Sequence, residues 1–95
     1  MAHITASEVA AAVRSKDPGS PLASPSRYQH RHEDHVTFMP VENVYPPLTL
    51  ETRENEQGYT AYTWRAGSTT RNGTWTSDTE ALIFTGFLRD YLMGR

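Results

Sequence analysis

The residues of this chain best suited to chemistry are three histidines in one short polar run. His30 and His32 are separated by one residue, and His35 follows, with Glu33 and Asp34 between them. On a strand, residues two apart project from the same face, so the first two imidazoles would point the same way. Imidazoles and carboxylates are ligands for zinc and other divalent metals. The run therefore indicates either a metal site, which a small hydrolase could use, or a solvated charged loop.

A second candidate lies in the threonine- and aromatic-rich segment 59–65, whose composition is typical of a β-strand. Alternation along such a strand predicts that Tyr62 and Trp64 lie under a helix, while the opposite face stays open. An exposed aromatic ring beside arginines is suited to contact with a protein partner or to stacking on bases. The predicted binding surface contains Tyr59, Thr63, Arg65 and Arg71.

The composition argues against several other kinds of site. The 95 residues include no cysteine, which excludes disulfides, thiolate catalysis and cysteine-ligated zinc. No glycine-rich phosphate loop and no nucleophile elbow occurs. A net charge of -2 argues against a nucleic-acid binder, which usually carries a basic field. Neither a signal peptide nor a membrane-spanning stretch is visible, so we expect a cytoplasmic protein with no membrane contact.

Two helices are predicted from their start signals. The segment Thr5-Ala6-Ser7-Glu8 matches a capping box and opens a short helix that ends before Asp17-Pro18-Gly19. A second capping box, Ser77-Asp78-Thr79-Glu80, precedes a longer helix over 81–93. Its apolar residues recur at helical spacing: Phe84, Phe87, Leu88 and Tyr91. Residues 17–35 begin rich in proline and serine and become strongly polar, which predicts a linker.

Strands are predicted over 36–39 and 48–53, in addition to 59–65. The second and third of these runs are separated by a polar loop that ends in Gly58, so they form a predicted hairpin. Asn72-Gly73 is a strong signal for a two-residue type I′ turn. That turn would place Arg71 opposite Thr74 in a second, short hairpin.

These elements predict a single α+β domain over 1–95, with an N-terminal helix in 1–16, a linker in 17–35 and a core in 36–95. The core is expected to be an antiparallel sheet of three or four strands packed on the C-terminal helix. We expect a non-enzymatic binding module without a cofactor, such as an adaptor, inhibitor or accessory subunit of bacterial or phage origin, which contacts another protein or a second copy. One alternative is a zinc or other metal site at the histidines, and another is a binder of single-stranded nucleic acid.

Overall fold

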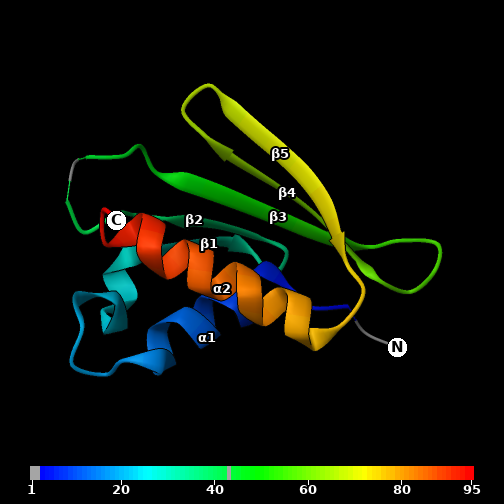
Figure 1. Cartoon of the computed structure of the whole chain (residues 1–95), viewed down its shortest axis with the longest axis horizontal. Helices are drawn as coiled ribbons and strands as arrows, with labels where there is room; N and C mark the ends of the chain where they lie inside the picture. The colour runs from blue at the N-terminus through cyan, green and yellow to red at the C-terminus, as the bar shows by residue number, and fades with distance from the viewer. Residues whose placement is uncertain (1–2, 43) are drawn as a thin grey trace.

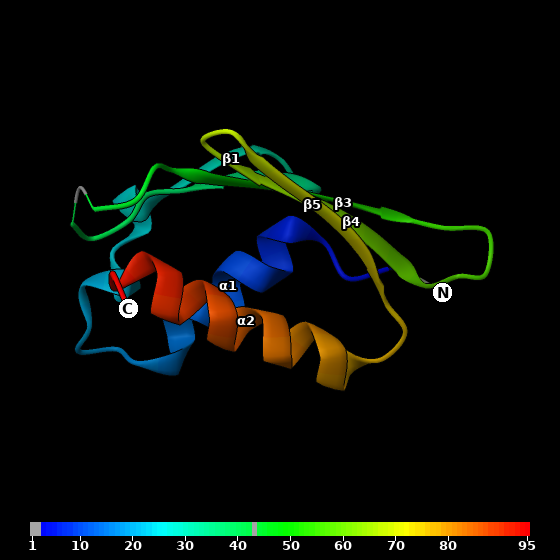
Figure 2. The same ribbon diagram turned by 45° about the horizontal axis from the view of Figure 1, so that its top comes forward.

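The computed structural model of this chain describes residues 3–42 and 44–95. Two helices cover one face of a single antiparallel sheet, whose strands follow one another in chain order (Figure 1; Figure 2). We call the face under the helices the covered face and the opposite one the outer face. The elements are α1 (Ala6–Lys16), β1 (Tyr28–His32), β2 (His35–Phe38), β3 (Leu48–Glu54), β4 (Thr60–Ala66), β5 (Thr69–Trp75) and α2 (Asp78–Leu92).

The architecture confirms the predicted α+β class, with five strands where three or four were expected. The extra strand is β1, which pairs with β2 within the segment predicted as a linker. That segment is ordered because two short 3-10 turns, Pro21–Ala23 and Pro25–Arg27, each begin at a proline whose fixed φ suits a first helical position. Leu22 is buried, and the hydroxyl of Tyr28 donates to its carbonyl at 2.6 Å. Burial also raises the pKa of Tyr28.

α1 forms the part of the core next to β1, β2 and β3. The predicted capping box is present: the Thr5 hydroxyl accepts from the Glu8 N–H, and the Glu8 carboxylate accepts from the Thr5 N–H. One side of the helix is completely enclosed, with buried residues Ala6, Val9, Ala10 and Val13. A helix this short is marginal alone, so its stability comes from this packing.

α2 lies beside α1 on the covered face and covers the part of the core next to β4 and β5. The Ser77 hydroxyl accepts from the Glu80 N–H and caps the helix, which begins at Asp78. The buried residues Ala81, Phe84, Leu88 and Leu92 follow helical spacing. Of the predicted apolar set, Phe84 and Leu88 are buried, whereas Phe87 is 41% exposed. Tyr62 packs on Phe84, with ring centroids 5.3 Å apart, and Trp64 packs on Phe87 at 5.5 Å. The contact between the helix and the aromatic strand is therefore the one the sequence predicts.

The hairpin after β4 differs from the prediction. The turn is at Gly67-Ser68, where Gly67 has φ +60°, and β5 continues through Asn72 and Gly73 without a break. A Cβ at Gly73 would lie 2.6 Å from Cζ of Tyr62, so the glycine is needed for close packing against this ring. The prediction of a turn at Asn72-Gly73 is wrong. The contact of Gly73 with the Tyr62 ring forms only in the folded sheet, and it outweighs the local preference for a turn.

No helix in residues 3–42 or 44–95 combines the length and the apolar character that crossing a membrane requires.

Candidate functional site

The outer face of the sheet is covered by neither helix, as Figure 2 shows. Strand register fixes which side chains it presents, because the residues that pair across antiparallel strands point to the same side. These are Gln29, His32, His35, Thr37, Thr49, Glu51, Arg53, Ala61, Thr63, Arg65, Thr70, Asn72 and Thr74. The outer face is thus polar and threonine-rich, and its strand positions include no Trp, Tyr or Phe.

Glu51 lies at the middle of this face, between the side chains of Arg65 and His35. Its Oε1 atom is 3.5 Å from Nη1 of Arg65 and 3.9 Å from Nε2 of His35. The row that contains His35 and Glu51 continues across β4 and β5 with Thr63 and Asn72, which are joined by a hydrogen bond of 3.0 Å from the Thr63 hydroxyl to Oδ1 of Asn72. Two predicted binding residues, Thr63 and Arg65, therefore lie on neighbouring rows of one polar surface.

A shallow hollow of about 470 Å³ opens on the outer face beside these rows. It forms where the small side chain of Ala61 leaves space between longer polar neighbours. Arg53 lines it with Thr63 and Thr74. Arg53 is exposed, and within the described part of the chain no carboxylate lies within ion-pair distance of it. The hollow therefore combines an uncompensated guanidinium with hydroxyl groups, a set suited to a carboxylate.

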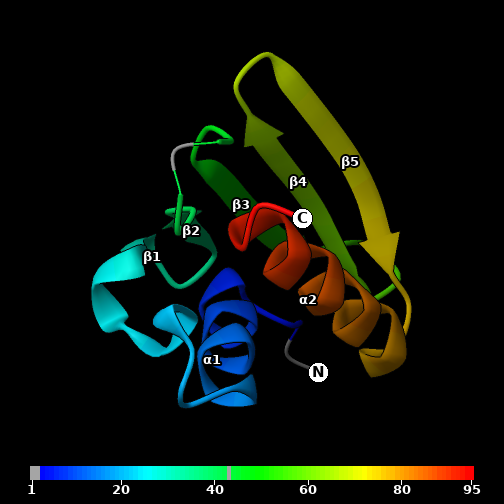
Figure 3. The same ribbon diagram turned by 60° about the vertical axis from the view of Figure 1, so that its left-hand side comes forward.

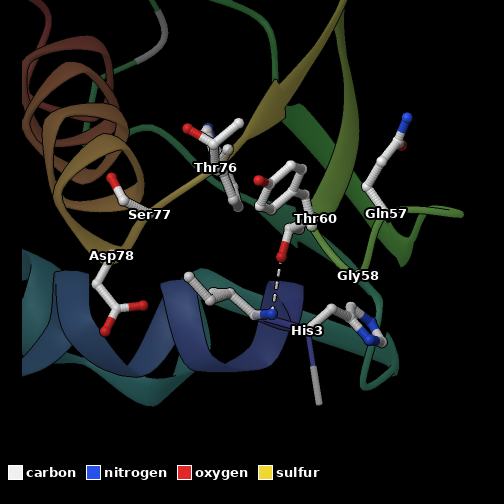
Figure 4. A pocket seen from close by; sticks show the side chains of 10 residues that line it. His3, Gln57, Gly58, Thr60, Thr76, Ser77 and Asp78 are labelled. Atoms are coloured by element: carbon white, nitrogen blue, oxygen red, sulfur yellow. Dashed lines mark hydrogen bonds between the residues drawn. The ribbon is translucent and has the colours of Figure 1, made fainter. Parts of the chain in front are cut away.

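Tyr59, the third predicted binding residue, does not lie in this hollow. It precedes β4 and lines a separate hollow of about 400 Å³ between the N-terminal segment, the β3–β4 loop and the start of α2 (Figure 4). His3 and Asp78 belong to the same lining, and one wall is closed by a hydrogen bond of 2.9 Å from the Ile4 N–H to the Thr60 hydroxyl. This position separates the tyrosine ring from Arg65.

Arg71, the fourth predicted residue, points to the opposite side of the sheet. It pairs with Trp64, so its side chain lies on the covered face, where the β4–β5 turn projects beyond both helices (Figure 3). The shifted turn is the reason, because Arg71 was expected in a hairpin centred on Asn72-Gly73. Here Arg71 lies opposite Trp64, whose ring packs on Phe87 of α2 with centroids 5.5 Å apart.

The structure also separates the three histidines of the predicted metal site. His30 Nδ1 lies 3.2 Å from the Ser7 hydroxyl of α1, which places this imidazole on the covered face. His32 Nδ1 accepts from the Asp34 N–H, and His35 lies on the outer face near Glu51. A bulge between His30 and His32 breaks their alternation. Across residues 3–42 and 44–95 no group of three or more His, Asp or Glu side chains converges on a metal site.

Two residues of the outer face, Glu51 and Arg53, were not among the predicted binding residues. The signal for them was present in the alternation of the 48–53 strand, which buries Leu48 and Leu50 and turns the intervening side chains outward. The predicted hairpin pairs this strand with β4, but the sequence did not specify the register, which places Arg53 opposite Ala61 and so beside the hollow.

No protein-family model matches this chain, and neither a curated protein sequence nor a solved structure matches it.

Proposed function

We propose that this chain is a non-enzymatic protein-binding module, an adaptor, inhibitor or accessory subunit, whose outer face binds an acidic segment of a partner protein. The observation that carries the proposal is Arg53, an exposed guanidinium at the rim of a polar hollow with no carboxylate in ion-pair distance among the described residues. A partner carboxylate would form a charge-assisted pair with Arg53 and accept a hydrogen bond from the Thr74 hydroxyl, while the Thr63 hydroxyl stays bonded to Asn72. Arg65 is already shared with Glu51 and would steer the approach.

A protein partner is favoured over single-stranded nucleic acid by the distribution of aromatic side chains. Binding of single strands depends on aromatic platforms on which successive bases stack. The rings of Tyr62, Trp64 and Trp75 belong to the covered face, where they pack on each other or on α2. The outer face offers hydroxyl, amide and guanidinium groups, which suit an extended peptide.

A hydrolytic role finds less support in the geometry. The one hydroxyl–imidazole pair, Ser7 with His30, is exposed, and in the described residues no carboxylate bonds to that imidazole to orient it. A nucleophile and base need such a third group to act efficiently.

The test is a titration of the ¹⁵N-labelled full chain with a synthetic peptide rich in Asp and Glu, followed by NMR shift mapping. We expect the largest shifts at Arg53, Thr63 and Thr74, and no more than weak shifts along α1. Arg53→Glu should remove the interaction, whereas Lys16→Glu, the same change of charge on an exposed helix end, should preserve it. Since charge attraction contributes, affinity should fall as salt is raised.

A parallel titration with oligothymidine separates the two kinds of partner. Shifts on the outer face with oligothymidine but none with the acidic peptide would replace this proposal with nucleic-acid binding. Peptide binding that is equally strong in Arg53→Glu would show that the hollow is not the contact.

A further inference from the structure

We propose that strand β5 pairs with β5 of a second copy of this chain, antiparallel, about a twofold axis at Asn72. This inference goes beyond the proposed function and depends on a different surface, the free edge of the sheet and the covered face beside it. The result would be one continuous sheet built from two five-stranded halves.

The backbone of β5 is open to such pairing. The two-residue turn makes Ala66 and Thr69 a hydrogen-bonded pair, and hydrogen bonding then alternates along β4 and β5. Three residues therefore direct their N–H and C=O groups away from β4: Thr70, Asn72 and Thr74. The Thr70 carbonyl accepts from Nη1 of Arg71 at 3.0 Å in the single chain, a bond that pairing with a second copy would replace. In the part of the chain that the structure describes, no strand pairs with this edge. Its seven residues contain no proline and a single charge, so the usual protection against edge pairing is weak.

The other edge of the sheet differs in each of these respects. β1 has five residues, a bulge between His30 and His32, and an arginine and two histidines among them. Bulges and charged side chains disfavour edge-to-edge association. Of the two edges, β5 is the one suited to a second strand.

One register of self-pairing satisfies the whole strand. The backbone N–H and C=O groups that point away from β4 in one copy must pair with the same kind of groups in the other copy. The twofold axis can therefore pass at Arg71, Asn72 or Gly73 while most of the two strands still overlap. An axis at Arg71 would put two guanidinium groups directly opposite each other, which is destabilising. Only the axis at Asn72 pairs all seven residues of the strand, with Thr70 opposite Thr74 and Arg71 opposite Gly73.

That register is also complementary on the covered face. Gly73 has no side chain, and beside it the Tyr62 ring stacks on Trp75 with centroids 4.7 Å apart. These rings, with Ile83 and Glu80, line a hollow of about 360 Å³ between β5 and α2. Arg71 of the second copy, placed opposite Gly73, would lie against the Tyr62 ring and extend toward the Glu80 carboxylate. The twofold axis repeats this contact, and this match of charge and shape identifies the occupant as a second copy.

The register can be read directly because the chain has no native cysteine. Paired residues in a hydrogen-bonded position have Cα atoms about 5.5 Å apart, within the range of a disulfide. We expect Asn72→Cys to form an intermolecular disulfide with itself under mild oxidation. Thr70→Cys alone should not, since its own counterpart would be roughly 13 Å away along the strand, but a mixture of Thr70→Cys and Thr74→Cys should cross-link.

Sedimentation equilibrium over a concentration series measures the association itself. We expect the full chain to approach twice its 10.7 kDa mass, and Arg71→Glu, which would bring carboxylates together, to weaken association at least tenfold. Arg71→Lys keeps the charge and serves as the matched control, and circular dichroism confirms that each variant is folded. A monomer at every concentration would overturn the proposal. A dimer that tolerates Arg71→Glu and does not cross-link at Asn72→Cys would overturn it equally, because association would then use another surface.

Discussion

The two faces of this sheet use threonine in opposite ways. On the covered face Thr52 and Thr60 are only 6% and 3% exposed, and each hydroxyl accepts from a backbone N–H of the N-terminal segment at 2.9 Å. On the outer face the hydroxyls of Thr37 and Thr49 form a partly solvent-exposed hydrogen bond to each other at 3.1 Å. The residue type follows from β propensity on both faces. Its energetic role depends on whether water can replace the bond.

The covered-face threonines explain how a short helix is held on the sheet. The Ala6 N–H, in the first turn of α1, has no partner within the helix and donates to the Thr52 hydroxyl. That hydroxyl in turn donates to Asp34 at 2.9 Å, and His3 Nε2 lies 2.7 Å from the same carboxylate oxygen. The network fixes the start of α1 on β3, whereas an outer-face hydroxyl fixes nothing beyond its neighbour.

The strongest test of the contrast compares adjacent residues of β3. Leu50 is fully buried on the covered face, so Leu50→Ala should lower the free energy of unfolding by about 3–5 kcal/mol through lost burial and a residual cavity. Thr49→Ala, one residue away on the outer face, should cost less than about 1 kcal/mol. Urea denaturation of both variants measures the difference. Similar losses would mean that the outer face is also enclosed, for instance by a partner.

The threonines themselves give the next largest effect. Thr52→Val keeps the shape but leaves the Ala6 N–H without an acceptor and removes one of the two contacts of Asp34 Oδ1, which should cost about 2–3 kcal/mol. Thr63→Val removes an exposed hydroxyl and should change stability by no more than about 0.5 kcal/mol. If thermal unfolding showed equal shifts for the two variants, burial would not be what distinguishes the threonines.

Two glycines, one packed closely in β5 and one in open space on α2, test the packing next to Tyr62. Gly73→Ala would force the Tyr62 ring to move and should destabilise the chain by about 1–2 kcal/mol. Gly86→Ala meets no atom within 4 Å and replaces a glycine inside α2, so it should stabilise by about 0.5–1 kcal/mol. Opposite signs in denaturation midpoints are the expected result. A neutral Gly73→Ala would contradict the tight contact with Tyr62.

Much of the fold could be predicted from local sequence signals. α1 begins at its predicted capping box, and the 48–53 and 59–65 strands follow their alternation. α2 begins after the predicted Ser77 cap, although the Glu80 carboxylate accepts from Thr76 and not from the Ser77 N–H, so the second capping box forms only in part. β1 could not be predicted, because its residues after Tyr28 are polar and exposed, and it forms only by adding to β2. The turn was misplaced for a related reason, since Gly73 serves a contact with Tyr62 that no local window contains.

The candidate site was predictable only in part for the same cause. Thr63 and Arg65 follow from alternation within one strand, and the structure places them on the outer face with Glu51. Arg71 lies on the covered face because the turn is at Gly67-Ser68 and not at the predicted Asn72-Gly73. Tyr59 lies in a different hollow. Alternation within one strand decides which of its residues share a face. Which residues of different strands become neighbours depends on the pairing register, and that register depends on packing between residues far apart in the sequence.

The smallest expected effect concerns the ion pair at the middle of the outer face. Glu51 and Arg65 have side chains 42% and 54% exposed and lie 3.5 Å apart, so their coupling should be only about 0.2–1 kcal/mol. A double-mutant cycle with Glu51→Gln and Arg65→Gln, followed by urea denaturation, measures it, and added salt should reduce it. The proposed function adds a second expectation. Glu51→Gln frees Arg65 for a partner, so this variant should bind the acidic peptide more tightly while its stability barely changes. A coupling well above 1 kcal/mol, or weaker peptide binding by Glu51→Gln, would show that the pair maintains the sheet and does not regulate access to a binding surface.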